Sequence, residues 1–166
     1  EMCIRDRFQD ISLLSDTVTN NIRIARPDAT QQEVIAAAKA ARIHDRIMEL
    51  PQGYDTIVGS DSAYLSGGEQ QRLTIARAFL QDAPIVLLDE ATAYADPHSE
   101  RAIQEALADL RGTRTVVVIA HRLHTIQDVD QIVVLNHGRI EATGTHSELL
   151  DTSPTYCGMW TAQQDA

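Results

Sequence analysis

Two short segments of the sequence carry residues that could bind a phosphate group. The first segment, Leu65–Arg72, reads Leu-Ser-Gly-Gly-Glu-Gln-Gln-Arg. Ser66 and Glu69 have the spacing of a capping box, which predicts a helix that begins near Gly67. Because glycine is a poor helix former, Gly67 and Gly68 favour another role, the close approach of an anion to free backbone N–H groups. A plain capped surface helix is the alternative for this segment alone.

The second segment is an apolar run, Ile85–Leu88, that ends in the acids Asp89 and Glu90. In open parallel sheets, ligands bind beyond the carboxyl ends of the strands. Asp89 suits a Mg²⁺ ion held through water, and Glu90 suits a water molecule that attacks a γ-phosphorus atom. His121 follows the next predicted strand and could donate a hydrogen bond to a phosphoryl oxygen; a surface or capping role is the alternative. Together with the first segment, these residues indicate ATP chemistry.

The elements that position these residues follow from the apolar pattern and the helix stops. Residues 28–50 have a helical period and are predicted to be mostly helix, and a second helix is predicted from Gly67 to about Leu80. Further along, we predict strands at 85–88, 115–120, 131–135 and 139–143, a helix at 97–110, a short helix at 145–150, and a hairpin turn at His137-Gly138. The alternation of strands and helices predicts a parallel sheet covered on both faces.

The composition argues against several classes of function. The chain has 166 residues, 43% of them hydrophobic, which allows one domain or one domain with a subdomain. With 14 basic and 24 acidic residues, the net charge of −10 offers no bulk attraction for nucleic acid or an anionic membrane. No apolar run approaches the roughly 18 residues of a membrane span. Cys3 and Cys157 show no metal-ligand or disulfide pattern, which favours a reducing cytoplasm, and His121 and His124 lack further ligands for zinc.

Taken together, the motifs resemble the nucleotide-binding domain of ATP-binding cassette (ABC) transporters, from about Phe8 to about Leu150. Five segments match family motifs in order: the Q-loop at 8–10, the signature motif at 65–72, Walker B at 85–90, the D-loop at 93–96 and the switch-histidine segment at 119–122. Segments 20–23, 26–30, 138–141 and 144–150 are similar to exporter-type members. The resemblance implies an α/β, P-loop NTPase-like partial domain, with a mostly parallel sheet flanked by helices and an inserted α-helical subdomain.

The resemblance also implies domain boundaries. Residues 8–82 would hold the Q-loop and the α-helical subdomain with the signature motif. Residues 83–150 would form the RecA-like α/β core with Walker B, the D-loop and the switch histidine, and residues 151–166 would be a C-terminal tail. Residues 1–7 are mostly charged and do not alternate, so we interpret them as a truncation edge or a joining artefact.

The family pattern assigns roles to individual residues. Glu90 and His121 would be catalytic, and Gln9 and Asp89 would hold Mg²⁺, mainly through water. The residues that would contact ATP are Gln9, Leu65, Ser66, Gly67, Gly68, Glu69, Gln70, Asp89 and Asp96. The implied cofactors are therefore ATP and Mg²⁺.

The resemblance further implies partners and a place in the cell. Two nucleotide-binding domains would form a head-to-tail dimer, in which each ATP lies between the Walker motifs of one subunit and the signature motif of the other. The transmembrane domains of the same chain or of a partner chain would dock on the helical subdomain. Such a protein would work at the cytoplasmic face of the cell's inner membrane and couple ATP hydrolysis to solute movement.

Three departures from the family pattern bear on this interpretation. A P-loop requires Gly-x-x-x-x-Gly-Lys-Ser/Thr, but the only lysine is Lys39, in an alanine-rich segment without glycine. We therefore expect a fragment of a longer protein, inactive by itself. The D-loop reads Ala-Tyr-Ala-Asp, with Tyr94 inside it, and Ser60 stands where exporter-type members commonly have Glu.

Two alternatives remain at the level of sequence. The altered D-loop would suit a non-hydrolysing, regulatory half of a heterodimeric ABC transporter. A soluble ABC-type ATPase that acts on chromosomes is less favoured, because the chain between Gln9 and Ser66 is too short for a long coiled coil and the composition is acidic.

Overall fold

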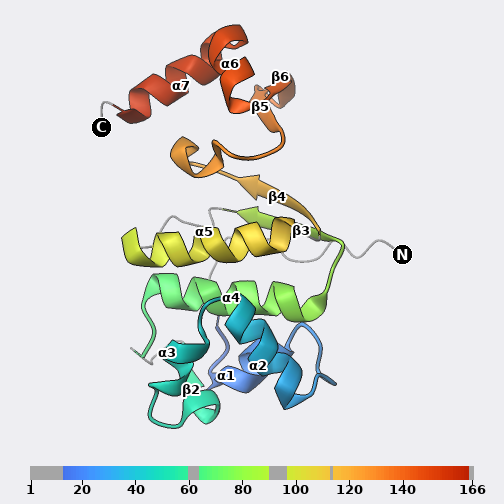
Figure 1. Cartoon of the computed structure of the whole chain (residues 1–166), viewed down its shortest axis with the longest axis vertical. Helices are drawn as coiled ribbons and strands as arrows, with labels where there is room; N and C mark the ends of the chain where they lie inside the picture. Colours follow the sequence, from blue (N-terminus) through green and yellow to red (C-terminus); the bar gives the residue numbers. More distant parts are fainter. Residues whose placement is uncertain (1–12, 60–63, 90–96, 113, 165–166) are drawn as a thin grey trace. The chain divides into compact units, whose positions relative to one another are not determined.

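The structure is a computed structural model that describes residues 13–59, 64–89, 97–112 and 114–164 (Figure 1). The chain divides into two compact units, one that ends at Ile119 and one that begins at Ala120. The predicted Q-loop at 8–10, Ser60, Glu90 and the predicted D-loop at 93–96 lie outside the described residues. Among the described helices, none has both the length and the apolar character needed to cross a lipid bilayer.

The first part of unit 1 is mainly helical. Its elements are β1 (Asp16–Thr17), α1 (Val18–Arg23), α2 (Gln31–Ala40), α3 (His44–Met48), the 3₁₀ helix η1 (Gly53–Asp55) and β2 (Ile57–Val58). The segment 28–50 is mostly helical, as predicted, but it breaks into two helices at Arg42, whose φ is 56°. The break allows Ala41 and Ile43, on either side of it, to be fully buried.

The strands β1 and β2 bring two distant segments together. They pair antiparallel, with Asp16 opposite Val58 and Thr17 opposite Ile57. Directly after β2, Gly59 has a φ of 125°, and a Cβ atom placed there would lie 2.6 Å from the carbonyl oxygen of Leu14. Only glycine fits this backbone conformation and this approach.

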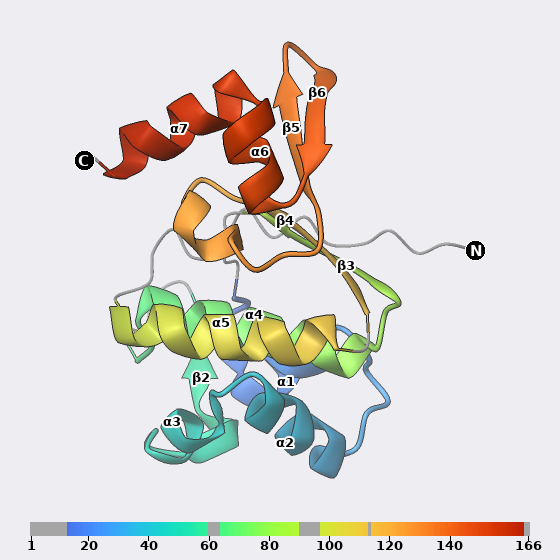
Figure 2. The same cartoon turned by 45° about the horizontal axis from the view of Figure 1, so that its top comes forward.

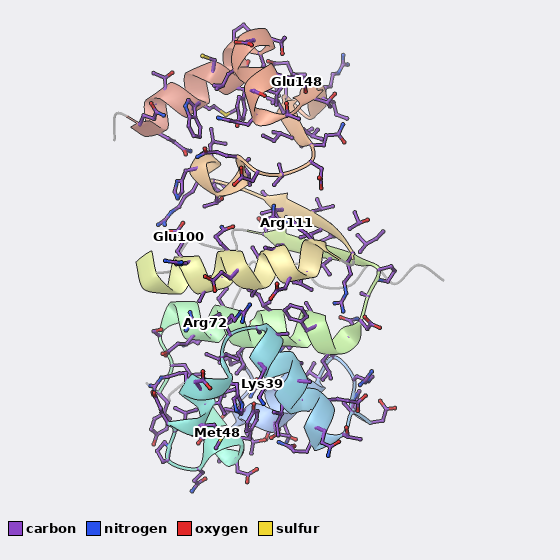
Figure 3. All side chains as sticks on the ribbon, viewed as in Figure 1. Lys39, Met48, Arg72, Glu100, Arg111 and Glu148 are labelled. Atoms are coloured by element: carbon purple, nitrogen blue, oxygen red, sulfur yellow. The ribbon has the colours of Figure 1, made fainter. Side chains whose placement is uncertain are left out.

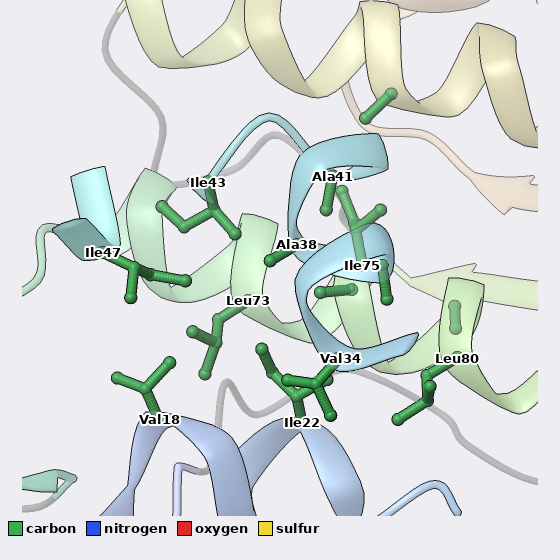
Figure 4. Close-up of a cluster of buried hydrophobic side chains, with 14 of the residues drawn as sticks. Val18, Ile22, Val34, Ala38, Ala41, Ile43, Ile47, Leu73, Ile75 and Leu80 are labelled. Atoms are coloured by element: carbon green, nitrogen blue, oxygen red, sulfur yellow. The ribbon is translucent and has the colours of Figure 1, made fainter. Parts of the chain in front are cut away.

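Helix α4 (Gly67–Gln81) starts at the predicted residue and forms the centre of unit 1. It contacts α1, α2 and α5. Figure 4 shows the buried side chains between α1, α2 and α4: Val18, Ile22, Val34, Ala38, Leu73, Ile75 and Leu80. The helix ends at Asp82, which adopts the left-handed conformation with φ 55°.

The sheet of unit 1 consists of β3 (Ile85–Asp89) and β4 (Thr115–Ile119), which run parallel as predicted. The face turned to the core carries Val86, Leu88, Val116 and Val118. On the opposite face, Ile85, Val117 and Ile119 are 40%, 45% and 53% exposed. Helix α5 (Pro97–Arg111) lies beside α4 in both views (Figures 1 and 2). Within the described residues, the covered face of the β3–β4 pair is the one that carries Val86 and Leu88.

Unit 2 contains a hairpin and two helices around a small core. Its elements are η2 (Leu123–Ile126), β5 (Ile132–Asn136), β6 (Arg139–Gly144), α6 (His146–Thr152) and α7 (Pro154–Gln164). The predicted hairpin turns at His137 and Gly138, with φ angles of 48° and 74°. The core consists of Leu123, Ile132, Val134, Leu149 and Tyr156. Helix α7 is an addition to the prediction, which gave no structure to the tail.

Candidate functional site

The candidate site is built around the turn that begins α4. The hydroxyl of Ser66 accepts a hydrogen bond from the N–H of Glu69 at 3.4 Å, and the carboxylate of Glu69 accepts one from the N–H of Ser66 at 2.7 Å. The predicted capping box is therefore confirmed. Within the described part of the chain, no hydrogen bond engages the N–H groups of Gly67 and Gly68. Both groups lie at the positive end of a helix of 15 residues, where an anion is stabilised.

Two other contacts hold this turn from behind. The side-chain amide of Gln70 donates to the carbonyl oxygen of Leu65 at 3.0 Å, and the side chain of Leu65 is buried in the core. The guanidinium group of Arg46, in α3, donates to the carboxylate of Glu69 and to the carbonyl oxygen of Tyr64, each at 2.9 Å. The turn is thus fixed by neighbours on its inner side, while Ser66 is exposed.

Asp89 lies where the sequence predicted it, at the carboxyl end of β3. Its Cα is paired with that of Ile119 at the end of β4, and its side chain is 8% exposed. A carboxylate at this edge of a parallel sheet fits a Mg²⁺ ion bound through water. Within the described residues, no group of three metal-ligating side chains is present.

His121 belongs to unit 2 and is exposed. Its carbonyl oxygen accepts a hydrogen bond from the side-chain amide of Gln163 at 2.5 Å, and the same amide group accepts one from the N–H of Leu123 at 2.8 Å. Gln163 in α7 therefore holds the main chain around His121. His124 lies in η2, which His121 precedes, so the two rings do not share a helix face.

Comparison with known proteins adds to this geometry. The sequence matches the family model "ABC transporter" over residues 4–93. The chain belongs to the ABC transporter family. It is 56% identical over 157 residues to the "Mycobactin import ATP-binding/permease protein IrtA" of Mycobacterium tuberculosis, with 95% of this chain and 18% of the relative covered. It is 49% identical over 156 residues to the "ATP-dependent lipid A-core flippase" of Haemophilus influenzae, with 93% of this chain and 27% of the relative covered.

A solved structure supports the same assignment. "Structure of a bacterial Atm1-family ABC exporter with ATP bound" matches with a TM-score of 0.86 and 46% sequence identity, and covers 93% of this chain and 27% of that chain. The resemblance to ABC transporters and the predicted fold class are therefore confirmed. The chain spans between 18% and 27% of the length of these ABC relatives.

Several residues of the ABC motifs lie outside the described residues. These are Gln9 of the Q-loop, Ser60, Glu90 of Walker B, and Tyr94 and Asp96 of the D-loop. Their predicted roles stay predictions, as do the predicted domain boundaries. Of the predicted site residues, the structure describes 65–70 and Asp89 in unit 1 and His121 in unit 2.

Sequence reasoning missed a buried polar junction behind the ABC signature helix. Asn21 in α1 is fully buried, and its side-chain amide donates to the carbonyl oxygens of Leu14, Asp16 and Thr17 at 3.0, 3.1 and 3.0 Å. Arg77 in α4 donates to the main-chain and side-chain oxygens of Asn21 at 2.8 and 2.9 Å. The junction fastens the segment that follows the Q-loop to α4. Arg77 and Asn21 are 56 residues apart, so no local sequence pattern predicts their contact.

A shallow hollow of about 310 Å³ lies between α2 and the C-terminal end of α4. The residues that line it are Arg26, Glu33, Ala36, Ala37, Ala40, Phe79, Leu80 and Asp82. Arg26 pairs with Glu33, and Asp82 pairs with Arg114 at 2.7 Å. Because its charged groups form ion pairs and it lies at the other end of α4 from Ser66, we do not assign this hollow to the nucleotide.

Proposed function

We propose that this chain is part of the ATP-binding and ATP-hydrolysing domain of an exporter-type ABC transporter, which couples hydrolysis to solute movement across a membrane. The observation that carries the proposal is the start of α4, where no hydrogen bond within the described residues engages the N–H groups of half-buried Gly67 and buried Gly68 at the positive end of the helix. The buried carboxylate of Asp89 at the end of a parallel strand supports it. The printed names of two relatives, an ATP-binding/permease protein and an ATP-dependent flippase, agree with it.

In this proposal, two faces of the chain act on different ATP molecules. The signature face, with Ser66, Gly67 and Gly68, binds the γ-phosphate of an ATP held by a second nucleotide-binding domain in a head-to-tail dimer. The Walker B face acts on the ATP of its own subunit. When bound, Mg²⁺ neutralises negative charge on the β- and γ-phosphates. Asp89 and Gln9 would hold the ion.

The remaining site residues act on the attacking water and on the γ-phosphate. Glu90 accepts a hydrogen bond from the water and takes its proton as the new bond from the water oxygen to the γ-phosphorus forms. The bond between the γ-phosphorus and the β–γ bridging oxygen breaks in the same displacement, and ADP leaves. His121 donates a hydrogen bond to a γ-phosphate oxygen. Asp96 contacts the opposite subunit near the dimer interface.

The proposal requires residues beyond this chain for the other side of the phosphates. The only lysine, Lys39, is exposed in the last turn of α2 (Figure 3) and does not belong to a P-loop sequence. A P-loop and transmembrane domains, which the much longer relatives have room for, would complete the transporter. The assembled protein would place this chain at the cytoplasmic face of the membrane.

ATP turnover of the complete transporter tests the proposal. Replacing Glu90 with Gln removes the proton acceptor but keeps the side-chain shape, so we expect turnover to fall by about 10²-fold or more while ATP binding persists. Glu105→Gln is the matched control, because it removes an exposed carboxylate that pairs with Arg101 on α5, and it should leave turnover unchanged. Equal turnover of the Glu90→Gln variant and the wild type would remove Glu90 from the role of base.

A second candidate function rests on the D-loop sequence, Ala-Tyr-Ala-Asp at residues 93–96. The chain could belong to a non-hydrolysing, regulatory half of a heterodimeric transporter that contributes its signature face and little chemistry. Trapping of ATP in one site of the assembled dimer, and turnover in the other, would favour this candidate. A soluble chromosomal ATPase gains no support, since the relatives named above are a permease protein and a flippase.

A further inference from the structure

The side chain of Arg46 spans the signature turn from one end to the other. Its Nε donates to one carboxylate oxygen of Glu69, and a terminal nitrogen donates to the carbonyl oxygen of Tyr64, both at 2.9 Å. The other terminal nitrogen is 3.2 Å from the carboxylate of Glu49. One guanidinium group thus contacts the residue two positions before Ser66 and the residue three positions after it.

Glu69 uses its two carboxylate oxygens for different partners. One oxygen accepts from the N–H of Ser66 and closes the capping box, while the other accepts from Arg46. A guanidinium group is planar, keeps its charge at all physiological pH values and offers several N–H donors in a fixed geometry, so it can hold two acceptors in a defined relation. The side chains of Arg46 and Glu69 are 35% and 17% exposed, so solvent weakens this pair less than a fully exposed one.

Arg46 is itself held in place by the core. It is followed by Ile47, which is fully buried, and α3 is preceded by Ile43, which is also fully buried. These side chains fix α3 against the interior of unit 1. The guanidinium group therefore connects the signature turn to a rigid support.

We propose that Arg46 is a positioning residue for the signature turn, and that it sets the direction of the N–H groups of Gly67 and Gly68 toward the nucleotide. The inference rests on the proposed function and deepens it. Backbone donors bind a phosphate best when they are already oriented, because no further ordering is then needed on binding. Without Arg46, the turn keeps its cap but loses its link to α3.

The test compares Arg46→Gln with Arg42→Gln in the complete transporter. Arg42 forms an ion pair of similar length, 3.0 Å, with Asp109 and makes no contact with the signature turn, so its variant is the matched control. We expect the KM for ATP of Arg46→Gln to rise by about threefold to tenfold, as fits the loss of one partly buried charge pair and one hydrogen bond. At saturating ATP the turn is occupied, so kcat should change by less than about twofold. Arg46→Lys, which keeps the charge but not the fork, should give an intermediate KM.

A double variant asks whether Arg46 acts through Glu69. Glu69→Gln keeps a residue that can serve in a capping box, but it removes the negative partner of Arg46. If the two side chains act as a pair, the rise in KM of the double variant is smaller than the product of the two single rises. If the rise in KM of the double variant instead equals the product of the two single rises, Arg46 does not act through Glu69.

The outcomes also separate this inference from the proposed function. A lower Tm for Arg46→Gln, with a KM for ATP equal to that of Arg42→Gln, would show a purely structural role and overturn the inference. The proposed function would still stand if the wild type hydrolyses ATP and the Glu90→Gln variant does not. Absence of ATP turnover in the complete wild-type protein would instead count against the proposed function itself.

Discussion

At the scale of single residues, the burial of Tyr54 makes the stability of the protein depend on pH. Its hydroxyl lies 2.9 Å from Nδ1 of His44, and the residue is 9% exposed. Burial raises the pKa of Tyr54 to about 12, and the negative charge of Asp45 adds to the effect. An unfolded chain returns the pKa to about 10. The unfolded state therefore loses this proton first as the pH rises, so stability from Tyr54 is fully present below pH 10 and is lost toward pH 12.

The corresponding prediction concerns Tyr54→Phe. Between pH 10 and pH 12, we expect the free energy of unfolding of the wild type to fall more than that of Tyr54→Phe. The extra loss over this range is at most about 2.7 kcal/mol. Urea denaturation at a series of pH values measures the difference. Tyr64→Phe, with a side chain that is 46% exposed, is the control and should follow the wild type. Identical slopes for the wild type and Tyr54→Phe would show that burial does not control this ionisation.

The residues of the signature turn divide into those that the sequence reveals and those that it hides. Ser66 and Glu69 are three positions apart, so their reciprocal hydrogen bonds follow from a local pattern. Arg46 and Glu69 are 23 positions apart, and their contact depends on how α3 packs. From the sequence alone, Arg46 is an arginine in a predicted helix, and no local pattern predicts its contact with the signature motif.

At the scale of elements, the junction between α1 and α4 depends on buried hydrogen bonds. The side chain of Asn21 bonds to three carbonyl oxygens and also accepts hydrogen bonds from the N–H of Leu14 and from Arg77. Removing it would leave buried carbonyl groups and the Arg77 guanidinium without those partners. Buried polar groups that lose their partners cost more than the net value of the bonds themselves.

We therefore predict that Asn21→Ala lowers the free energy of unfolding by about 3 kcal/mol or more. Asn20→Ala is the matched control, because Asn20 is an exposed neighbour in the same helix whose side chain donates to Asp16 at 2.9 Å. Its cost should be below about 1 kcal/mol. Urea denaturation of the three proteins gives both values, and a similar loss for the two alanine variants would argue against the junction.

Element boundaries were predictable where a local signal marks them. Helix α4 begins at its capping box and ends before Pro84, as the sequence indicates. The break between α2 and α3 carries neither glycine nor proline, and it forms because Ala41 and Ile43 are both drawn into the core. The start of helix α7 also has a local signal, since Ser153 directly precedes Pro154 and its hydroxyl accepts a hydrogen bond from the N–H of Tyr156 at 3.2 Å.

At the scale of the whole molecule, the two compact units have separate hydrophobic cores. The core of unit 1 includes residues from Val18 to Leu110, and that of unit 2 includes Leu123 to Tyr156. Leu149 in α6 is 1% exposed and belongs to the second core. A substitution in one core should therefore destabilise mainly the unit that contains it.

We predict that Leu149→Ala destabilises unit 2 by about 2–5 kcal/mol, the cost of a buried leucine replaced by alanine. Hydrogen exchange should show lost protection in β5, β6, α6 and α7, whereas α4 keeps its protection. Leu135→Ala, at a position that is 68% exposed, is the control and should leave both units unchanged. An equal loss of protection in α4 would mean that the two units unfold together.

The approach of Gly59 to Leu14 links two stretches of chain that flank the nucleotide motifs. One stretch leads away from the Q-loop and the other leads toward the signature turn, and the ladder from Asp16 to Val58 and from Thr17 to Ile57 joins them. Asn21 ties the first stretch to α4. The two stretches therefore belong to one hydrogen-bonded assembly that includes α4, the helix that carries Gly67 and Gly68.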